Sequence, residues 1–177
     1  MKFETIHSEN IFQGRAINLW REKVQYPDGR IATVEVIRHP GAVTILPLDD
    51  EGQIWFVRQY RHPVGDMLLE LPAGTLEPGE PPEITAAREI REEIGMAAAK
   101  LEELQSLYLA PGYSTEYMHN FLATGLYPEQ LEQDYSEFIQ VEKYPVEEVY
   151  AMFDRGEITD GKTIALLAIL RQRLTDK

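Results

Sequence analysis

The stretch REIREEIG, residues 88–95, contains three glutamates within five positions. At 100° per residue, a helix would place Glu89, Glu92 and Glu93 within one arc of about 100°. Apolar residues gather on the opposite side of that helix, which we expect to be its core face: Ile84, Ala87, Ile90 and Ile94. Hard divalent cations such as Mg²⁺ and Mn²⁺ prefer several carboxylate oxygens that converge from a rigid element. The spacing therefore suits a metal site.

The same glutamates also suit a solvated acidic face, on which Arg88 and Arg91 relieve the negative charge. Like charges three or four residues apart cost a helix only about 0.2–0.5 kcal/mol per pair. The charge alone therefore does not decide between a metal site and a solvated face.

Turn and cap signals place the acidic stretch late in a helix. Pro81 and Pro82 introduce this helix, and Gly95 is suited to end it as the C′ residue. The preceding segment MLLELPAG predicts a short strand that ends in a glycine loop. The loop and the helix together must position any site built on the glutamates.

Strand-like runs surround the helix on both sides in the sequence. Residues 13–38 form two runs around Pro27-Asp28-Gly29, which predict a hairpin. AVTILPL and IWFVRQYR, separated by the turn signal DDEGQ, predict a second hairpin. LEELQSLYLA, EYMHNFLATGLY and FIQVEKYPV are further strand candidates, followed by helices near residues 146–155 and 162–174. This order predicts an α+β fold in which a mixed sheet has helices on both faces.

The amino-acid composition of the chain restricts the kinds of molecule that it can bind. The chain has 177 residues, no cysteine and a formal net charge of −13. Its length suits one well-buried domain, and the missing cysteines leave no disulfide or thiolate zinc site. The acidic charge argues against nucleic acid and anionic membranes, and no apolar run approaches the about 20 residues that span a bilayer. We expect a cytoplasmic protein, in which cations must lie between the chain and any anionic substrate.

The sequence around the glutamates resembles the complete Nudix box. In this motif a glycine loop is followed by Glu and then by the pattern Arg-Glu-aliphatic-any-Glu-Glu-any-Gly-aliphatic. Every defined position of this pattern is filled: Gly74, Glu80, Arg88, Glu89, Ile90, Glu92, Glu93, Gly95 and Met96. So many fixed residues at fixed spacing rarely arise by chance, and they favour the metal site over the solvated face.

The resemblance extends over most of the chain. RQYR, LLELPAG, LAPGYSTE with Pro111, and DGKTIALLAIL are similar to the ADP-ribose pyrophosphatase / nucleoside diphosphate sugar hydrolase branch of the Nudix superfamily. The resemblance implies an α/β/α sandwich with N-terminal antiparallel strands. It also implies Mg²⁺-dependent cleavage, with Mn²⁺ as an alternative metal, of a small-molecule sugar nucleotide into a nucleoside monophosphate and a sugar phosphate. Which sugar nucleotide is preferred, and how many metal ions are used, stay open.

The resemblance also assigns metal-binding roles within the box. Glu89 and Glu93 are the first choices as ligands, Glu92 shares a second metal, and the backbone carbonyl of Ala73 faces the cluster. The remaining box residues are expected to be structural: Gly74, Glu80, Arg88 and Gly95. Among these, Glu80 fixes the turn before the helix, and Arg88 pairs with Glu92 one turn on.

The general base has three candidates. In the resembled branch a glutamate-bearing loop completes the site, and Glu137 in EQDYSEFIQV matches it. Such loops often alternate carboxylates, whereas this chain has Tyr135 and Ser136 before Glu137. This departure leaves Glu92 and Glu93 as alternatives for the role, and a solvated strand-entry residue as the alternative role for Glu137.

Four further residues are candidates for substrate binding. Arg58 and Arg61 end a predicted strand before the box, and a planar guanidinium can bind phosphate with two hydrogen bonds. Side chains alternate between the two faces of a strand, so Arg58 and Arg61 lie on opposite faces, and we rank Arg58 above Arg61 for substrate binding. Tyr113 suits stacking on a base or ribose, and Glu116 suits a sugar hydroxyl. The alternative role for the two arginines is a surface salt bridge. The alternative role for Tyr113 and Glu116 is in the turn that follows Pro111 and Gly112.

The N-terminal strands complete the prediction. By resemblance, residues 1–41 form a β-hairpin arm for dimerisation that also lines the nucleobase pocket, and residues 42–177 form the Nudix hydrolase domain. We therefore expect a homodimer. The competing function is a non-catalytic module that senses sugar nucleotides with the same fold, and the intact box argues against it.

Overall fold

The computed structural model describes residues 2–132 and 138–175 of the chain. It divides into two units, one made of Met1–Gly41 with Tyr108–Tyr117 and the other of Ala42–Leu107 with Met118–Lys177. Within the described residues, every helix is too short or too polar to cross a bilayer.

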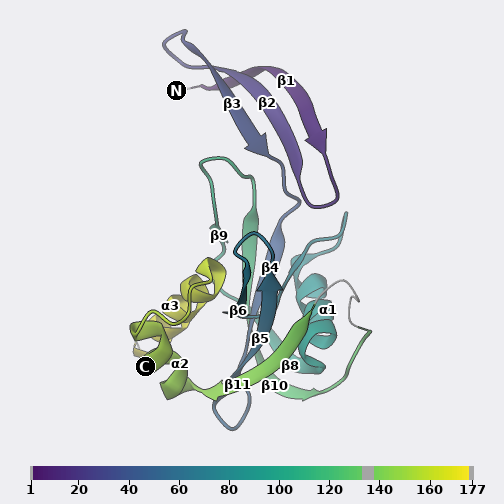
Figure 1. The fold of residues 1–177 in the computed structure, drawn as a ribbon, viewed down its shortest axis with the longest axis vertical. Helices are drawn as coiled ribbons and strands as arrows, with labels where there is room; N and C mark the ends of the chain where they lie inside the picture. The colour runs from purple at the N-terminus through teal and green to yellow at the C-terminus, as the bar shows by residue number, and fades with distance from the viewer. Residues whose placement is uncertain (1, 133–137, 176–177) are drawn as a thin grey trace. The chain divides into compact units, whose positions relative to one another are not determined.

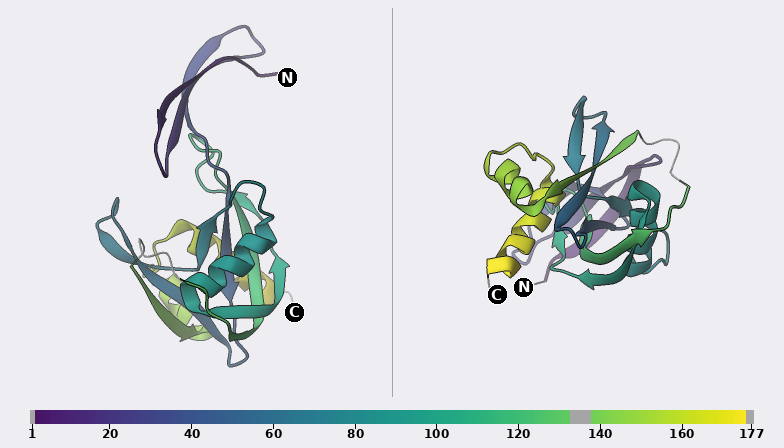
Figure 2. Two further views of the ribbon diagram at one scale, coloured as in Figure 1. Left: turned by 90° about the vertical axis from the view of Figure 1, so that its right-hand side faces the viewer. Right: turned by 90° about the horizontal axis from the view of Figure 1, so that it is seen from below.

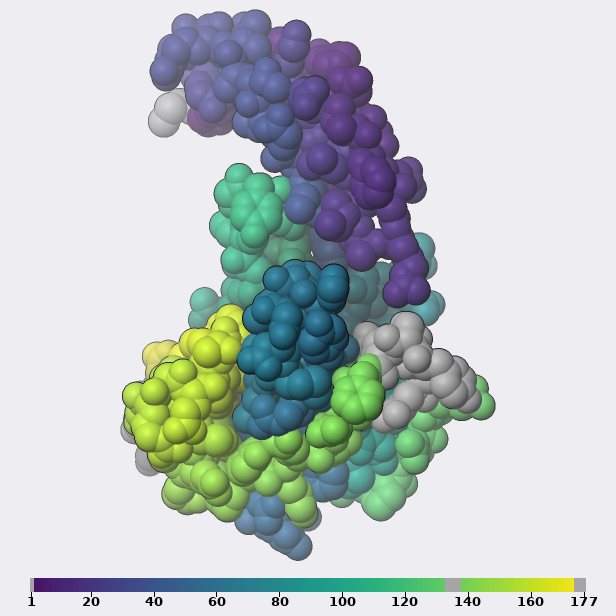
Figure 3. Space-filling model, in the orientation of Figure 1, coloured from purple at the N-terminus to yellow at the C-terminus, as the bar shows by residue number. Residues whose placement is uncertain are grey.

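The first unit contains a three-stranded antiparallel sheet in the order β1-β2-β3 (Figure 1). Its strands are β1 (Glu4–Gln13), β2 (Asn18–Gln25) and β3 (Ile31–Ile37). The predicted hairpin around residues 27–29 is confirmed as the β2–β3 pair. Strand β1 was not predicted, because all ten of its residues are exposed and no alternation of apolar and polar residues marks a buried face. Figure 3 shows β1, in purple, on the surface of this unit.

The second segment of the first unit, Tyr108–Tyr117, is attached to the end of β3 by backbone hydrogen bonds. The N–H of Ile37 donates to the carbonyl of Tyr113 at 2.7 Å, and the N–H of Thr115 donates to that of Ile37 at 3.0 Å. The loop that contains Pro111 is thereby fixed to the N-terminal sheet.

The second unit is built on two sheets (Figure 1). The larger, in the order β7-β4-β10-β8, contains β4 (Ala42–Pro47), β7 (Ala73–Thr75), β8 (Met96–Glu103) and β10 (Tyr117–Pro128), with β9 (Leu107–Tyr108) also paired to β10. Strands β4 and β10 are parallel, whereas β4–β7 and β8–β10 are antiparallel, so this sheet is mixed as predicted. The smaller sheet is antiparallel in the order β11-β5-β6, with β5 (Gln53–Arg61), β6 (Asp66–Glu70) and β11 (Ile139–Pro145).

Helices pack on both sides of these strands, which confirms the predicted α+β arrangement (Figure 2). Helix α1 (Pro82–Ile94) contributes Ala86, Ile90 and Ile94 to one apolar core. Helices α2 (Val146–Asp154) and α3 (Gly161–Thr175) contribute to a second core through Val149, Leu166 and Leu167. The strands between them supply both cores, since side chains alternate between the two faces of a strand.

The predicted hairpin between β4 and β5 is wrong. The two strands belong to different sheets and share only one antiparallel bridge, between Leu48 and Ile54. Their connection is a tight turn in which Asp49 Oδ1 accepts from the N–H groups of Glu51 and Gln53. Beyond it, β4 pairs with β7 and β10, whereas β5 pairs with β6 and β11, although both strands contribute side chains to both apolar cores.

Candidate active site

Helix α1 has the predicted start and end. Pro81 is its N-cap and Pro82 its first residue, and Gly95 closes it in the left-handed conformation at φ 70°. The N–H of Gly95 donates to the carbonyl of Ile90, which satisfies an otherwise unpaired group at the helix end. The glutamates therefore lie on the last two turns of a well-terminated helix.

The core face of α1 differs in part from the prediction. Ile90 and Ile94 are buried as expected, but Ile84 is 55 % exposed and Ala86, rather than Ala87, is fully buried. Glu93 is only 5 % exposed, so it belongs to the buried side of the helix. The alternative of a solvated acidic face is therefore wrong for Glu93.

The carboxylates of Glu93 and Glu89 contact the loop that precedes the helix. Glu93 Oε2 accepts a hydrogen bond from the N–H of Ala73 at 3.0 Å. The Glu89 carboxylate lies against Gly74, where a Cβ atom would come within 1.9 Å of both Cδ and Oε1 of Glu89. A side chain at this position would displace the Glu89 carboxylate, so the glycine of the motif is explained by the approach of Glu89.

Arg88 links the other acidic residues of the motif. Its Nη1 donates to Glu89 Oε1 at 2.7 Å and to Glu92 Oε2 at 3.0 Å, the second being the predicted pair one turn apart. Its Nη2 donates to Glu80 Oε2 at 3.1 Å, and Glu80 also accepts from the Thr85 hydroxyl at 2.8 Å. The hydrogen bonds from Arg88 hold the pKa of Glu80 below its usual value, although burial opposes this. Glu80 thus joins the loop to the first turns of the helix.

The carboxylate oxygens at this place are of the type that binds a hard divalent cation. Carboxylate oxygens from one rigid helix face a glycine loop, and the missing Cβ of Gly74 leaves the space that the Glu89 carboxylate occupies. Among the described residues, no group of three or more Asp, Glu, His or Cys side chains is arranged to hold a metal ion. In this arrangement the positive charge beside Glu89 and Glu92 comes from Arg88.

Both candidate arginines of β5 are paired with glutamates. Arg58 donates from Nε and Nη2 to Glu142 at 2.6 and 2.9 Å, and Arg61 donates likewise to Glu70 at 2.8 and 2.7 Å. Arg58 lines a depression of about 380 Å³ between the β5–β6 hairpin and the residues that connect α2 to α3. The side chains of Arg58 and Arg61 are 33 % and 39 % exposed, so each guanidinium is held in place while part of it faces solvent.

The Arg58–Glu142 pair predicts a specific pH dependence of stability. Hydrogen bonds from Arg58 lower the pKa of Glu142 below 4.5, although burial opposes them. A carboxyl group with a lowered pKa in the folded state stabilises that state above the unfolded pKa, and this contribution is lost as the pH falls through the folded pKa. We expect the difference in unfolding free energy between wild type and Glu142→Gln to be largest near neutral pH and to shrink below about pH 4.5.

Urea unfolding followed over this pH range measures the difference. Glu51→Gln is the control, because the Glu51 side chain is 73 % exposed and lies 4.0 Å from Lys143. A Glu142→Gln difference that stays constant with pH would contradict the prediction.

The remaining candidates belong to the first unit or fall outside the described residues. Tyr113 and Glu116 belong to the first unit, where Tyr113 is 60 % exposed. Glu137, with Tyr135 and Ser136, lies outside the described residues.

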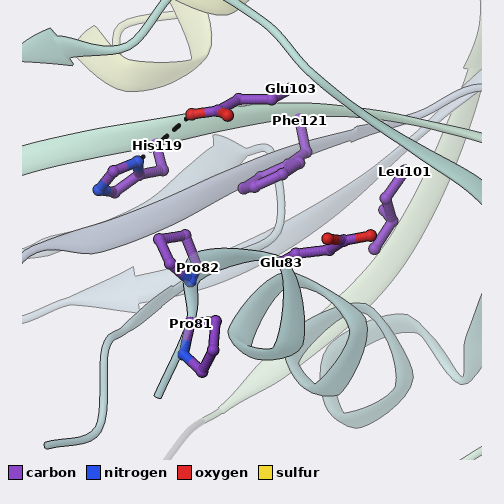
Figure 4. Close-up of a pocket in the computed structure, with 7 residues that line it drawn as sticks. All are labelled: Pro81, Pro82, Glu83, Leu101, Glu103, His119 and Phe121. Carbon is purple, nitrogen blue, oxygen red and sulfur yellow. Dashed lines mark ion pairs between the residues drawn. The ribbon is translucent and has the colours of Figure 1, made fainter. Parts of the chain in front are cut away.

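A separate pocket of about 490 Å³ is lined by Pro81, Pro82, Glu83, Leu101, Glu103, His119 and Phe121 (Figure 4). None of these seven residues is a predicted site residue, and His119 Nδ1 lies 3.5 Å from Glu103 Oε1.

Sequence reasoning missed the partners of these site residues. Glu70, Glu142, Lys162 and Thr163 carry no local signal of a role, although a charged residue at the end of the apolar run MLLE could have drawn attention to Glu70. Glu70 is 1 % exposed and Thr163 is fully buried. Buried polar groups need partners, and each of these two has one in a distant segment, Lys162 for Glu70 and Leu71 for Thr163.

Helix α1 thus holds Glu89 and Glu93 against the glycine loop on one side of the strands, and α2 and α3 pack on the other side. Residues 38–167 match the NUDIX domain model, and the chain belongs to this family. It is a Nudix pyrophosphohydrolase with the Nudix fold, in a family that generally uses divalent metal ions.

Three similar proteins define the comparison. The chain is 40 % identical over 170 residues to an ADP-ribose pyrophosphatase of Bacillus subtilis (strain 168), covering 95 % of this chain and 92 % of that one. It is 45 % identical over 166 residues to an ADP-ribose pyrophosphatase of Mycobacterium tuberculosis, covering 92 % and 80 %. A crystal structure of an ADP compounds hydrolase superimposes with a TM-score of 0.89 at 25 % identity, covering 99 % of this chain and 96 % of that one.

Proposed function

We propose that this protein catalyses the Mg²⁺-dependent hydrolysis of the pyrophosphate bond in ADP-ribose or a related nucleoside diphosphate sugar. The products are a nucleoside monophosphate and a sugar phosphate. The observation that carries the proposal is the approach of Glu89 and Glu93 to the Ala73–Gly74 backbone, which brings two carboxylates against neighbouring residues of one loop. The similarity to two ADP-ribose pyrophosphatases supports the substrate class.

Glu89, Glu93 and Glu92, with the carbonyl of Ala73, are the proposed holders of Mg²⁺, for which Mn²⁺ can substitute. When bound, the ion supplies positive charge to phosphate oxygens and makes a nearby water more acidic. Glu93 is oriented by the N–H of Ala73, and Glu89 by Gly74 and Arg88, so the chain fixes these two carboxylates before substrate arrives.

The chain must also accept a proton from the attacking water. Two of the three candidates, Glu92 and Glu93, lie among the described residues. The side chain of Glu92 is 27 % exposed, whereas Glu93 is buried and accepts a hydrogen bond from Ala73. We assign the base to Glu92, with Glu93 and Glu137 as the alternatives. A Glu92→Gln variant with the wild-type rate and pH profile, beside an impaired Glu137→Gln, would transfer the role to Glu137.

Substrate binding is proposed for Arg58, Arg61, Tyr113 and Glu116. A guanidinium fixed by a carboxylate loses little side-chain entropy when it binds phosphate, which favours the paired arginines. Arg58→Lys and Arg61→Lys keep the charge but not the planar fork, so a rise in KM for only one of them would identify the phosphate contact.

We propose that residues 1–41 form the dimerisation arm, which also contributes to the nucleobase pocket, and that residues 42–177 form the hydrolase domain. The supporting observation is that β1 exposes all ten residues, including Ile6, Ile11 and Phe12. Light scattering should give the mass of a homodimer, and a fully active monomer would refute the arm's role.

The substrate assay decides between hydrolase and sensor. Purified protein is incubated with ADP-ribose, GDP-mannose, UDP-glucose or a nucleoside triphosphate, each with Mg²⁺ and with EDTA, and products are identified by mass. Metal-dependent release of a nucleoside monophosphate from one sugar nucleotide supports the proposal. Tight binding of one compound without turnover would instead favour the sensing module.

A further inference from the structure

The first turn of α3 is joined to the end of β6 through a buried hydroxyl group. Asp160 Oδ2 accepts from the N–H of Thr163 at 2.9 Å and from its hydroxyl at 2.6 Å. The same hydroxyl accepts a hydrogen bond from the N–H of Leu71 at 2.8 Å. Thr163 and Leu71 are both fully buried, so neither group can turn to water if the bond is lost.

A second connection joins the same two segments. Glu70, also buried, pairs with Lys162 of α3 in addition to Arg61 of β5, and Lys162 lies 3.0 Å from Asp160 Oδ1. Burial raises the pKa of Glu70, but Arg61 and Lys162 outweigh this and hold it below its usual value. Residues 70 and 71 are therefore bound to the start of α3 by a charged pair and a neutral hydrogen bond.

The three residues that follow are bound to other elements. The carbonyl of Pro72 accepts from the N–H of Ile45 on β4 at 2.8 Å. Ala73 donates to Glu93, and Gly74 contacts Glu89, both on α1. The segment 70–74 is thus attached to α3 at its start and to α1 at its end, without a gap between the two attachments.

We propose that Thr163, with Asp160 and Lys162, positions residues 70–74 so that the Ala73 backbone and Glu93 meet in the arrangement that binds the divalent ion. This inference rests on the metal-binding part of the proposed function. Thr163 acts through Leu71 and touches neither metal nor substrate, so it is a positioning residue. Its hydroxyl is suited to this because it accepts from Leu71 and donates to Asp160 at once, which fixes its direction.

Thr163→Val tests the proposal, because valine has nearly the same shape but cannot pair with Leu71. Thr163→Ser retains the hydroxyl and is the conservative variant. Leu170→Ala is the matched control for stability, since Leu170 is buried in the same helix two turns further on and has no hydrogen bond to residues 70–74 among those described. The affinity for Mn²⁺ is measured by electron paramagnetic resonance without substrate, and amide hydrogen exchange is measured at Leu71.

We expect Thr163→Val to bind Mn²⁺ about tenfold or more weakly, in the range found when groups that orient metal ligands are removed. The amide of Leu71 should exchange faster in this variant. Thr163→Ser should retain the affinity and the slow exchange, and Leu170→Ala should retain the affinity despite a lower melting temperature. Equal Mn²⁺ affinity in wild type and Thr163→Val would overturn the proposal, as would a parallel loss in Leu170→Ala.

Two further outcomes are decisive. If Thr163→Val does not fold, Lys162→Met takes its place, because Glu70 then keeps Arg61 as a partner; weaker Mn²⁺ binding supports the proposal, and wild-type binding overturns it. If wild type binds Mn²⁺ and Thr163→Val binds it weakly, but no sugar nucleotide is hydrolysed, the proposed function fails while the positioning role stands. A wild-type protein that binds no Mn²⁺ overturns the positioning role.

Discussion

Glu93→Gln should reduce metal-dependent hydrolysis by about 10²- to 10³-fold, since bound metals contribute several kcal/mol of transition-state stabilisation and each ~1.4 kcal/mol is tenfold in rate. Glutamine has nearly the same volume, and its carbonyl oxygen can still accept from the N–H of Ala73. The fold should therefore persist while the negative charge is lost. The measurement is kcat over a range of Mg²⁺ concentrations, together with the melting temperature.

The control for Glu93→Gln is Glu83→Gln, which removes the same charge from the exposed first turn of α1. This variant should retain the wild-type rate, because Glu83 lies outside the carboxylate cluster. A Glu93→Gln enzyme with near wild-type kcat at every metal concentration would exclude Glu93 from the site. Glu89→Gln should behave like Glu93→Gln, although it also replaces the ion pair with Arg88 by a neutral acceptor.

Gly74→Ala should reduce activity by a comparable factor, about 10²-fold, because a displaced ligand forfeits much of the same stabilisation. The added Cβ would lie 1.9 Å from Glu89 Cδ, so the carboxylate or the loop must move. We expect weaker Mn²⁺ binding and a lower melting temperature. Gly161→Ala is the control, because a Cβ there meets nothing within 4 Å and the residue has no positive φ.

A double-mutant cycle separates this clash from other effects of the added methyl group. In a Glu89→Ala background the carboxylate is absent, so Gly74→Ala should no longer lower the melting temperature. The same decrease in both backgrounds would show that the contact with Glu89 is not the cause.

Local signals predicted the acidic helix well. Pro81, Pro82 and Gly95 act through their own backbone conformations, so the sequence was sufficient to place both ends of α1. The Arg88–Glu92 pair was also predictable, because residues four apart on a helix are neighbours.

Long-range pairing could not be predicted in the same way. The strands β4 and β5 are adjacent in sequence but belong to different sheets, and only their distant partners decide this. Arg58 finds Glu142 84 residues away, and Leu71 finds Thr163 92 residues away. Periodicity placed Glu93 on a carboxylate face, but Glu93 is buried and bonded to Ala73, which lies in a different element.

The grouping of Glu80, Glu89 and Glu92 around Arg88 has a consequence for folding itself. Three carboxylates share one guanidinium, so with all three ionised the group has two more negative than positive charges. Self-repulsion of this kind opposes the compact state, and an ion that binds only the folded chain stabilises it by about 2.7 kcal/mol at 100 times its Kd. The melting temperature should therefore rise with Mg²⁺ concentration and fall in EDTA, even without substrate. The divalent ion would then be a thermodynamic partner of the folded chain as well as a reagent.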